Sequence, residues 1–121
     1  MREIKFRAWD ILRSRMIVDA QDIYDLSIPA DAFSDILHDE MFIVEQFTGL
    51  RDKNGVEIYE GDKIEFTETD RMPAATVVLK NGCFVAYDDL WETWNFLFSV
   101  HDRVIVTGNI HESPELLEKG K

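Results

Sequence analysis

Polar and apolar residues alternate at the start of the chain. From residue 3 to residue 9, the apolar side chains of Ile4, Phe6 and Ala8 fall on one face and the charged side chains on the other. This alternation has the period of a half-buried β-strand. Residues 15–18 are also strand-like, so we predict a pair of N-terminal strands joined by a polar connection.

The spacing of apolar residues becomes helical after Pro29. Phe33, Ile36 and Leu37 lie three and four residues apart within the segment 31–37. Side chains at this spacing share one face of a helix, and a preceding proline is compatible with a helix start. We therefore predict a short helix over 31–37.

Two further strands flank a tight turn in the middle of the chain. Residues 41–47 and 62–66 are strand-like, and the segment 52–55 reads Asp-Lys-Asn-Gly. Asp at the first position and Gly at the fourth are typical of a type I turn. A two-residue loop at its Asn-Gly would set Asp52 opposite Glu57, which is a like-charge pair. We therefore predict the longer turn.

The clearest element is a hairpin over 75–87, because Asn81-Gly82 separates two apolar runs. A two-residue loop predicts the cross-strand pairs Lys80–Cys83, Leu79–Phe84, Val78–Val85 and Val77–Ala86. One face then holds Val77, Leu79, Phe84 and Ala86, and the other holds Val78, Cys83 and Val85. Both faces are apolar, so we expect one to fill a barrel and the other to meet the rest of the chain or a second subunit.

The C-terminal part predicts two more strands, over 95–100 and 103–107, and a short helix over 113–120. Ser113 is suited to cap that helix and Gly120 to end it. About eight short strands with two short helices favour a mainly β fold, a small barrel with additions.

Composition narrows the function classes. The chain has 121 residues, 45% hydrophobic and 31% charged, which is an ordinary balance for one globular domain. The net charge of −11 argues against a general nucleic-acid coat, because that function needs an excess of cations. A single cysteine, Cys83, excludes an intramolecular disulfide and a Cys-built zinc cluster.

Targeting and cofactor signals are missing from the sequence. The N-terminus lacks the apolar run of a signal peptide, and no apolar stretch is long enough to span a bilayer. The six glycines are too far apart for a phosphate-binding loop. We therefore expect no cofactor, no metal, no membrane association, and a protein that stays in the cytoplasm where it is made.

Three stretches of the chain together resemble the YopX family of phage-encoded proteins. They are REIKFRAWD at 2–10, QFTGLRDKNGVEIYEGD at 46–62 and VTGNIHESPELL at 106–117. His111 and Ser113 stand where this resemblance leads us to expect Tyr and Asn, so no role of that aromatic ring is carried over.

The resemblance implies a mainly β protein with an SH3-like barrel in its C-terminal two-thirds. It implies one YopX-like domain over 1–121, with an N-terminal β addition and acidic segment at 1–45 and the barrel and short helix at 46–121. It also implies a phage or prophage origin and work in the cytoplasm of a bacterial host. It supplies no catalytic activity and no catalytic residues.

Trp91 and Trp94 are the first candidate contact residues. They lie three apart, so one helical turn would place them on the same side. One interpretation is a cap over the barrel. The other is an anchor for a protein partner or a second subunit, because tryptophan is enriched among the residues that dominate binding energy.

An acidic segment is the second candidate. From residue 16 to residue 50 there are eight Asp or Glu residues and no Lys or Arg. One interpretation is a solvated segment that aids solubility. The other is a mimic of a phosphate backbone that occupies a host DNA-binding protein, with candidate contacts at Asp22, Asp25, Asp35 and Asp39.

The function that we favour is a non-catalytic phage accessory protein that binds a host or phage protein. An alternative is a nucleic-acid accessory factor that touches DNA or RNA directly. Its cations would be Arg2, Lys5, Arg7, Arg13 and Arg15. We do not expect an enzyme, because an enzyme needs a polar pocket with convergent titratable groups, which distant sequence positions do not reveal. Self-association through the hairpin is a further alternative.

Overall fold

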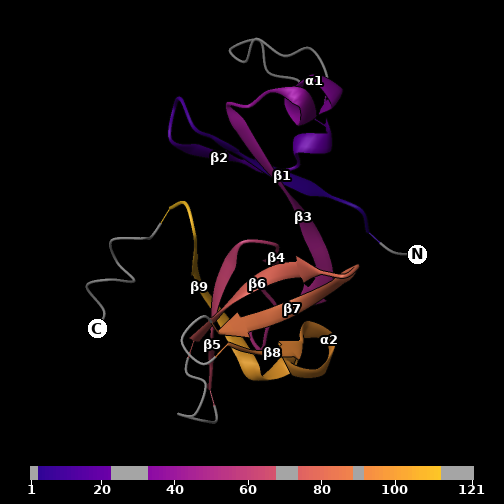
Figure 1. The fold of residues 1–121 in the computed structure, drawn as a ribbon, viewed down its shortest axis with the longest axis vertical. Coiled ribbons are helices and arrows are strands. Elements are labelled where there is room, and N and C mark those ends of the chain that lie inside the picture. Colours follow the sequence, from indigo (N-terminus) through magenta and orange to yellow (C-terminus); the bar gives the residue numbers. More distant parts are fainter. Residues whose placement is uncertain (1–2, 23–32, 68–73, 89–91, 113–121) are drawn as a thin grey trace. The chain divides into compact units, whose positions relative to one another are not determined.

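The computed structural model describes residues 3–22, 33–67, 74–88 and 92–112. The chain forms two compact units, residues 1–47 and 48–121. Among the described residues, no helix has the length and apolar character needed to cross a membrane. The elements, shown in Figure 1, are β1 (Phe6–Asp10), β2 (Arg15–Ile17), the 3-10 helix η1 (Ala20–Asp22), α1 (Phe33–His38), β3 (Phe42–Arg51), β4 (Glu57–Tyr59), β5 (Asp62–Phe66), β6 (Ala74–Lys80), β7 (Cys83–Asp88), β8 (Thr93–Phe96), α2 (Leu97–Val100), the 3-10 helix η2 (His101–Arg103) and β9 (Val104–Asn109).

The first unit is built on the predicted N-terminal strands. β1 pairs antiparallel with β2 on one side and with β3 on the other. β3 continues past residue 47 into the second unit, where β4 is its neighbour in the sheet order. Ala8 lies opposite both Ile17 and Val44, and it is fully buried. Its small side chain leaves room for the helices, and the core of this unit consists of Ala8, Ala20, Ile36 and Phe42.

The predicted helix after Pro29 is present as α1, although Pro29 itself lies outside the described residues. Ile36 is fully buried, and the Phe33 ring lies 5.0 Å from the Phe6 ring, centroid to centroid. Leu37, which was expected on the same face, is 51% exposed. In this six-residue helix Ile36 is buried and Phe33 is half-buried, so the side that faces the core runs through these two positions, three residues apart, and leaves Leu37 at its edge.

The charged face predicted for the first strand is not fully solvated. Arg7 is only 8% exposed, and its Nε donates to Glu45 Oε1 at 2.9 Å. Arg7 and Glu45 are direct partners across the antiparallel pair β1–β3, so their side chains meet on one face of the sheet. The predicted alternation of faces along β1 is present, but Glu45 of the partner strand β3 also buries Arg7 on the charged face.

The central turn has the predicted form. Gly55 N–H donates to Asp52 O at 3.0 Å, and Gly55 has the positive φ of 84° that glycine adopts without strain. The turn connects β3 to the short strand β4, and the Thr48 hydroxyl donates to Ile58 O at 2.7 Å between these strands.

The second unit contains a five-stranded antiparallel sheet, ordered β8-β7-β6-β5-β9 and curled in Figure 1. All four predicted hairpin pairs are present between β6 and β7. Asn81 and Gly82 both have positive φ, as a type I′ turn requires. The mainly β prediction is therefore confirmed, whereas the finer SH3-like assignment stays a prediction.

The strand predicted over 95–100 is wrong in its second half. β8 ends at Phe96, and α2 follows directly from Leu97 to Val100. Leu97 is fully buried and Val100 is 4% exposed. Their three-residue spacing places both side chains in the core on a helical turn, whereas a strand would point them to opposite faces.

The core of the second unit lies on the inner face of the β6–β7 hairpin. Val77 and Ala86 are fully buried and Phe84 packs against them, as predicted, but Leu79 near the turn is 50% exposed. The core residues are Ile58, Ile64, Ala75, Val77, Ala86, Leu97, Val100 and Val104. The predicted strand over 103–107 is present as β9, and the helix predicted over 113–120 lies outside the described residues.

Candidate functional site

The outer face of the second sheet carries the candidate site. In the register of β6, β7 and β8, Val85 lies opposite Phe96, Tyr87 opposite Trp94, and Lys80 opposite Cys83. Because alternate residues of a strand share a face, these side chains project from the side of the sheet opposite the core.

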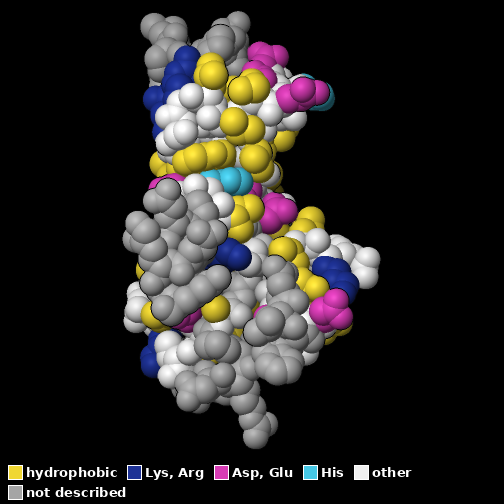
Figure 2. Space-filling view, turned by 60° about the vertical axis from the view of Figure 1, so that its left-hand side comes forward, with side chains coloured by type: hydrophobic (Ala, Val, Ile, Leu, Met, Phe, Trp, Pro, Cys, Tyr) yellow, Lys and Arg dark blue, Asp and Glu magenta, His cyan; other side chains and the backbone are white. Residues whose placement is uncertain are grey.

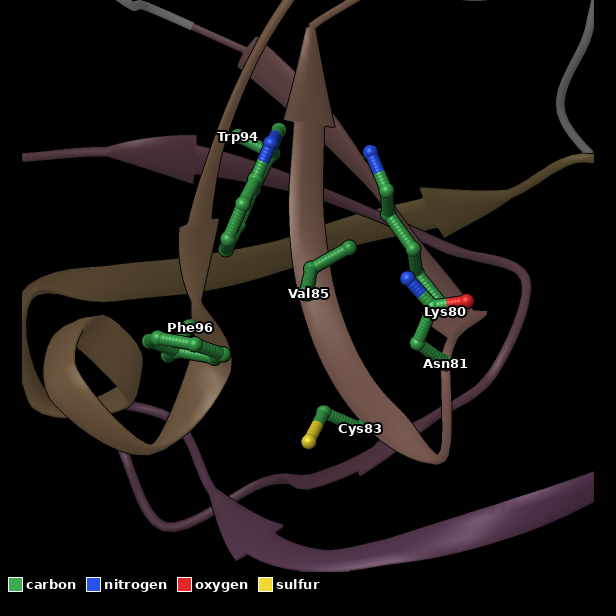
Figure 3. Close-up of a pocket in the computed structure, with 6 residues that line it drawn as sticks. All are labelled: Lys80, Asn81, Cys83, Val85, Trp94 and Phe96. Carbon is green, nitrogen blue, oxygen red and sulfur yellow. The ribbon is translucent and has the colours of Figure 1, made fainter.

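A pocket of about 210 Å³ opens on this face. Figure 3 shows Lys80 and Asn81 on one side, Trp94 and Phe96 on the other, with Val85 between them and Cys83 near the hairpin turn. Val85 is only 1% exposed, so the side chains around it cover it closely. The pocket therefore has an apolar floor, two aromatic residues and one ammonium group.

The aromatic side chains of this region remain accessible. Trp94 is 42% and Phe96 49% exposed, and their rings meet edge to face with centroids 5.1 Å apart. Lys80 Nζ lies 5.1 Å from the centroid of the Trp94 ring, which is cation–π geometry. Phe98, on α2, is 78% exposed.

Of the two predicted tryptophans, the structure places Trp94 at the pocket, and Trp91 lies outside the described residues. Trp94 belongs to β8, so it is not on the helical turn that the spacing suggested. Sequence reasoning missed Lys80, Asn81 and Phe96. The signal that could have found Phe96 is the short alternation Trp94-Asn95-Phe96, which places both aromatic rings on one face.

The predicted acidic contacts belong to the first unit. Asp22 lies in η1 and Asp35 in α1, which pack against each other, and both side chains are exposed. Asp39 has a local structural role, since its Oδ1 accepts the Met41 N–H at 2.9 Å. Asp25 lies outside the described residues. In the view of Figure 2, Lys and Arg gather on one side of this unit and Asp and Glu on the other.

The N-terminal cations pair with carboxylates. Lys5 Nζ lies 3.2 Å from Glu3, and Arg13 and Arg15 both approach the buried Asp10. Burial alone would raise the pKa of Asp10. The hydrogen bonds from Arg13 and the charges of both arginines outweigh it and hold this pKa below its usual value. Arg7 pairs with Glu45, and Arg2 lies outside the described residues.

Polar residues of the two later motifs serve the fold. The Asp52 carboxylate accepts hydrogen bonds from the N–H groups of Asn54, Val56 and Val106, which joins the central turn to β9. Asp62 accepts the Tyr59 N–H at 2.7 Å. Within the described ranges, no three His, Cys, Asp or Glu residues gather as a metal site would require.

A family model described as "YopX protein" matches residues 5–118. The chain belongs to the YopX family. A crystal structure of protein EF1440 from Enterococcus faecalis matches this YopX-family chain with 26% identity and a TM-score of 0.56, covering 97% of this chain and 99% of that one. The structure of YopX from Bacillus subtilis matches with 17% identity and a TM-score of 0.61, covering 96% and 98%. No curated protein matches the sequence.

Proposed function

We propose that this YopX-family chain is a non-catalytic accessory protein of a phage or prophage. It binds another protein in the cytoplasm of the bacterial host, through the pocket beside Trp94. The observation that carries the proposal is the exposed edge-to-face pair of Trp94 and Phe96 beside that pocket. Exposed aromatic residues around a small apolar hollow are typical of the anchors that dominate protein–protein binding.

The position of β8 supports the same function. β8 is the last strand of its sheet order, and its four residues, Thr-Trp-Asn-Phe, carry no charge and no proline. Proteins commonly place charged residues or proline in edge strands to prevent unwanted pairing, and β8 has neither. An uncharged edge with two exposed aromatic rings is suited to a partner that covers it.

Two buried carboxylates of the second unit support a non-catalytic function. Asp52 and Asp62 accept backbone N–H groups, so their oxygen atoms are used by the scaffold. The side chains around the pocket are a lysine, an asparagine, a cysteine and apolar groups. This set is better suited to holding a side chain than to exchanging protons between paired acids and bases.

The test is affinity capture from a nuclease-treated lysate of the bacterial host, with and without infection. We expect wild-type protein to retain one stoichiometric protein, and Trp94→Ala to weaken retention by about 30-fold, the loss typical of a dominant anchor. Val56→Ala is the matched control, because Val56 is 48% exposed in the same unit but does not line the pocket. Equal retention by wild-type protein and folded Trp94→Ala would refute the proposal.

A second candidate function is imitation of a phosphate backbone by the acidic segment. Its specific support is the exposure of Asp22 and Asp35 on the neighbouring elements η1 and α1. We expect Asp22→Asn combined with Asp35→Asn to reduce both the capture of a DNA-binding partner and the salt sensitivity of that capture. Unchanged capture across a salt series would eliminate this candidate.

Direct nucleic-acid binding receives less support. The cations proposed for it that the structure describes lie against carboxylates: Lys5 against Glu3, Arg7 against Glu45, and Arg13 and Arg15 against Asp10. Phosphate binding depends on the release of counterions by uncompensated cations. If a partner is captured from untreated lysate but not from nuclease-treated lysate, direct nucleic-acid binding becomes the favoured function.

A further inference from the structure

The size of the pocket limits what can occupy it. Its volume of about 210 Å³ lies below the roughly 300 Å³ at which pockets for small-molecule ligands begin. The lining combines Val85, Trp94 and Phe96 with the stem of Lys80. A single bulky apolar side chain of a partner fits this volume and this lining.

The rim of the pocket carries a positive charge, the ammonium group of Lys80. Lys80 is the one charged residue among the described residues that line the pocket, in a chain whose net charge is −11. Its ammonium group lies over the Trp94 ring, and among the described residues no carboxylate forms an ion pair with it. Arg7 and Arg51, in contrast, lie against Glu45 and Glu57. A partner carboxylate would therefore meet a cation that no described carboxylate pairs with, beside an apolar hollow.

We propose that the pocket takes a partner segment in which a bulky apolar residue stands next to an acidic one. The apolar side chain fills the space over Val85, between the aromatic pair and Lys80, and the acidic side chain pairs with Lys80. This inference rests on the proposed function, because it names the class of partner for the same surface. It does not apply to a second copy of this chain, since two chains of net charge −11 repel each other.

The test uses blocked synthetic peptides as probes: Ser-Asp-Leu-Asp-Ser, its Asn-Leu-Asn and Lys-Leu-Lys analogues, and its Asp-Ala-Asp analogue. Two readouts report on the pocket, namely the NMR shift of the Trp94 indole N–H and the rate of Cys83 alkylation by iodoacetamide. Alkylation is site-specific because Cys83 is the only cysteine, and it is exposed at the pocket.

We expect the Asp-Leu-Asp peptide to shift the indole signal and to slow alkylation. Replacing its Leu by Ala should weaken binding about tenfold, because a large apolar contact is lost. The Asn-Leu-Asn peptide should bind up to about fivefold more weakly at low salt, the range of an exposed ion pair. Equal binding of the Asp and Asn peptides, or tighter binding of the Lys peptide, would overturn the inference.

Two lysine variants separate charge from packing. Lys80→Met keeps an apolar stem and should remove the difference between the Asp and Asn peptides while leaving the Leu contribution. Lys53→Met is the matched control, because Lys53 is an exposed lysine of the same unit that does not line the pocket. A persistent preference for the Asp peptide in Lys80→Met would overturn the assignment of Lys80.

The two proposals fail in different ways. If Trp94→Ala loses the captured partner but no peptide binds wild-type protein, the proposed function stands and this inference is overturned. If folded Trp94→Ala retains the partner, the proposed function fails whatever the peptides do. Sedimentation velocity supplies a third outcome: a dimer that Trp94→Ala dissociates would assign the pocket to a second copy and overturn the inference.

Discussion

The two units of this chain bury charge in different ways. In residues 1–47, buried charges meet other side-chain charges, as Arg7 meets Glu45 and Asp10 meets Arg13 and Arg15. In residues 48–121, the buried carboxylates of Asp52 and Asp62 accept backbone N–H groups. Both arrangements satisfy a buried charge, but among the described residues the one at Asp52 does so without a second ionised side chain.

The difference determines how each unit responds to substitution. Removing one member of a buried ion pair leaves the other charged and desolvated, which is expensive, whereas removing both is tolerated far better. Among the described residues, Asp52 is held by backbone N–H groups and has no charged side-chain partner to remove with it. Its loss leaves buried donors that no second substitution can neutralise. Four substitutions test this distinction.

Arg7→Ala should have the largest effect. The change leaves Glu45 buried at 4% exposure without its 2.9 Å partner, so we expect a loss of about 3–5 kcal/mol in the free energy of unfolding. Urea unfolding followed by circular dichroism measures it. The double variant Arg7→Met with Glu45→Leu should recover most of that loss. A double variant as unstable as Arg7→Ala would contradict the ion-pair explanation.

Asp52→Ala should have the next largest effect. Three backbone N–H groups lose their acceptor, and the link from the central turn to β9 is broken. We expect a loss of about 3 kcal/mol in unfolding free energy, because each unsatisfied donor is costly. Asp52→Asn keeps one carbonyl acceptor and should lose less. Similar unfolding curves for Asp52→Ala and wild-type protein would show that the turn is held by other contacts.

Asp10→Asn should change the dependence of stability on pH. The folded-state pKa of Asp10 lies below its usual value of 3.8, so the folded state binds fewer protons than the unfolded state in that range. The stabilisation is therefore present above about pH 4 and is lost as pH falls through the folded-state pKa. Between about pH 5 and pH 3, wild-type protein should lose more stability than Asp10→Asn. Parallel stability curves for the two proteins would refute this.

Glu57→Ala should have the smallest effect, because its partner Arg51 lies in solvent. The Arg51 Nη2 to Glu57 Oε2 distance is 3.3 Å, and the Arg51 side chain is 50% exposed. We expect a loss of no more than about 1 kcal/mol, and a smaller loss in high salt. A loss comparable with that of Arg7→Ala would show that burial does not explain the difference in stability contribution between the Arg7–Glu45 and Arg51–Glu57 ion pairs.

Local signals predicted most of the secondary structure. Asn81-Gly82 predicted both the hairpin and its register, because a two-residue loop with two positive φ angles admits one pairing of its flanking strands. The Asp-Lys-Asn-Gly segment predicted its own turn for the same reason. These elements depend on residues that are close in sequence, so a single chain is enough to identify them.

The candidate site was predicted only in part. Trp94 was chosen for its residue type, and the structure adds Lys80, Val85 and Phe96 from three strands. The cation–π contact joins residues 14 positions apart, across β7. The helical spacing that linked Trp94 to Trp91 was misleading, because β8 continues through Trp94 and the helix begins only at Leu97.

Backbone preferences and alternation over a few residues were enough to predict the mainly β class, the two turns and the hairpin register. The burial of Arg7, the start of a helix at Leu97 and the contact of Lys80 with Trp94 could not be predicted in this way. Each of these depends on which strand or core surface lies opposite the residue. The free energy of burying a side chain is set by that neighbour and not by the residue alone.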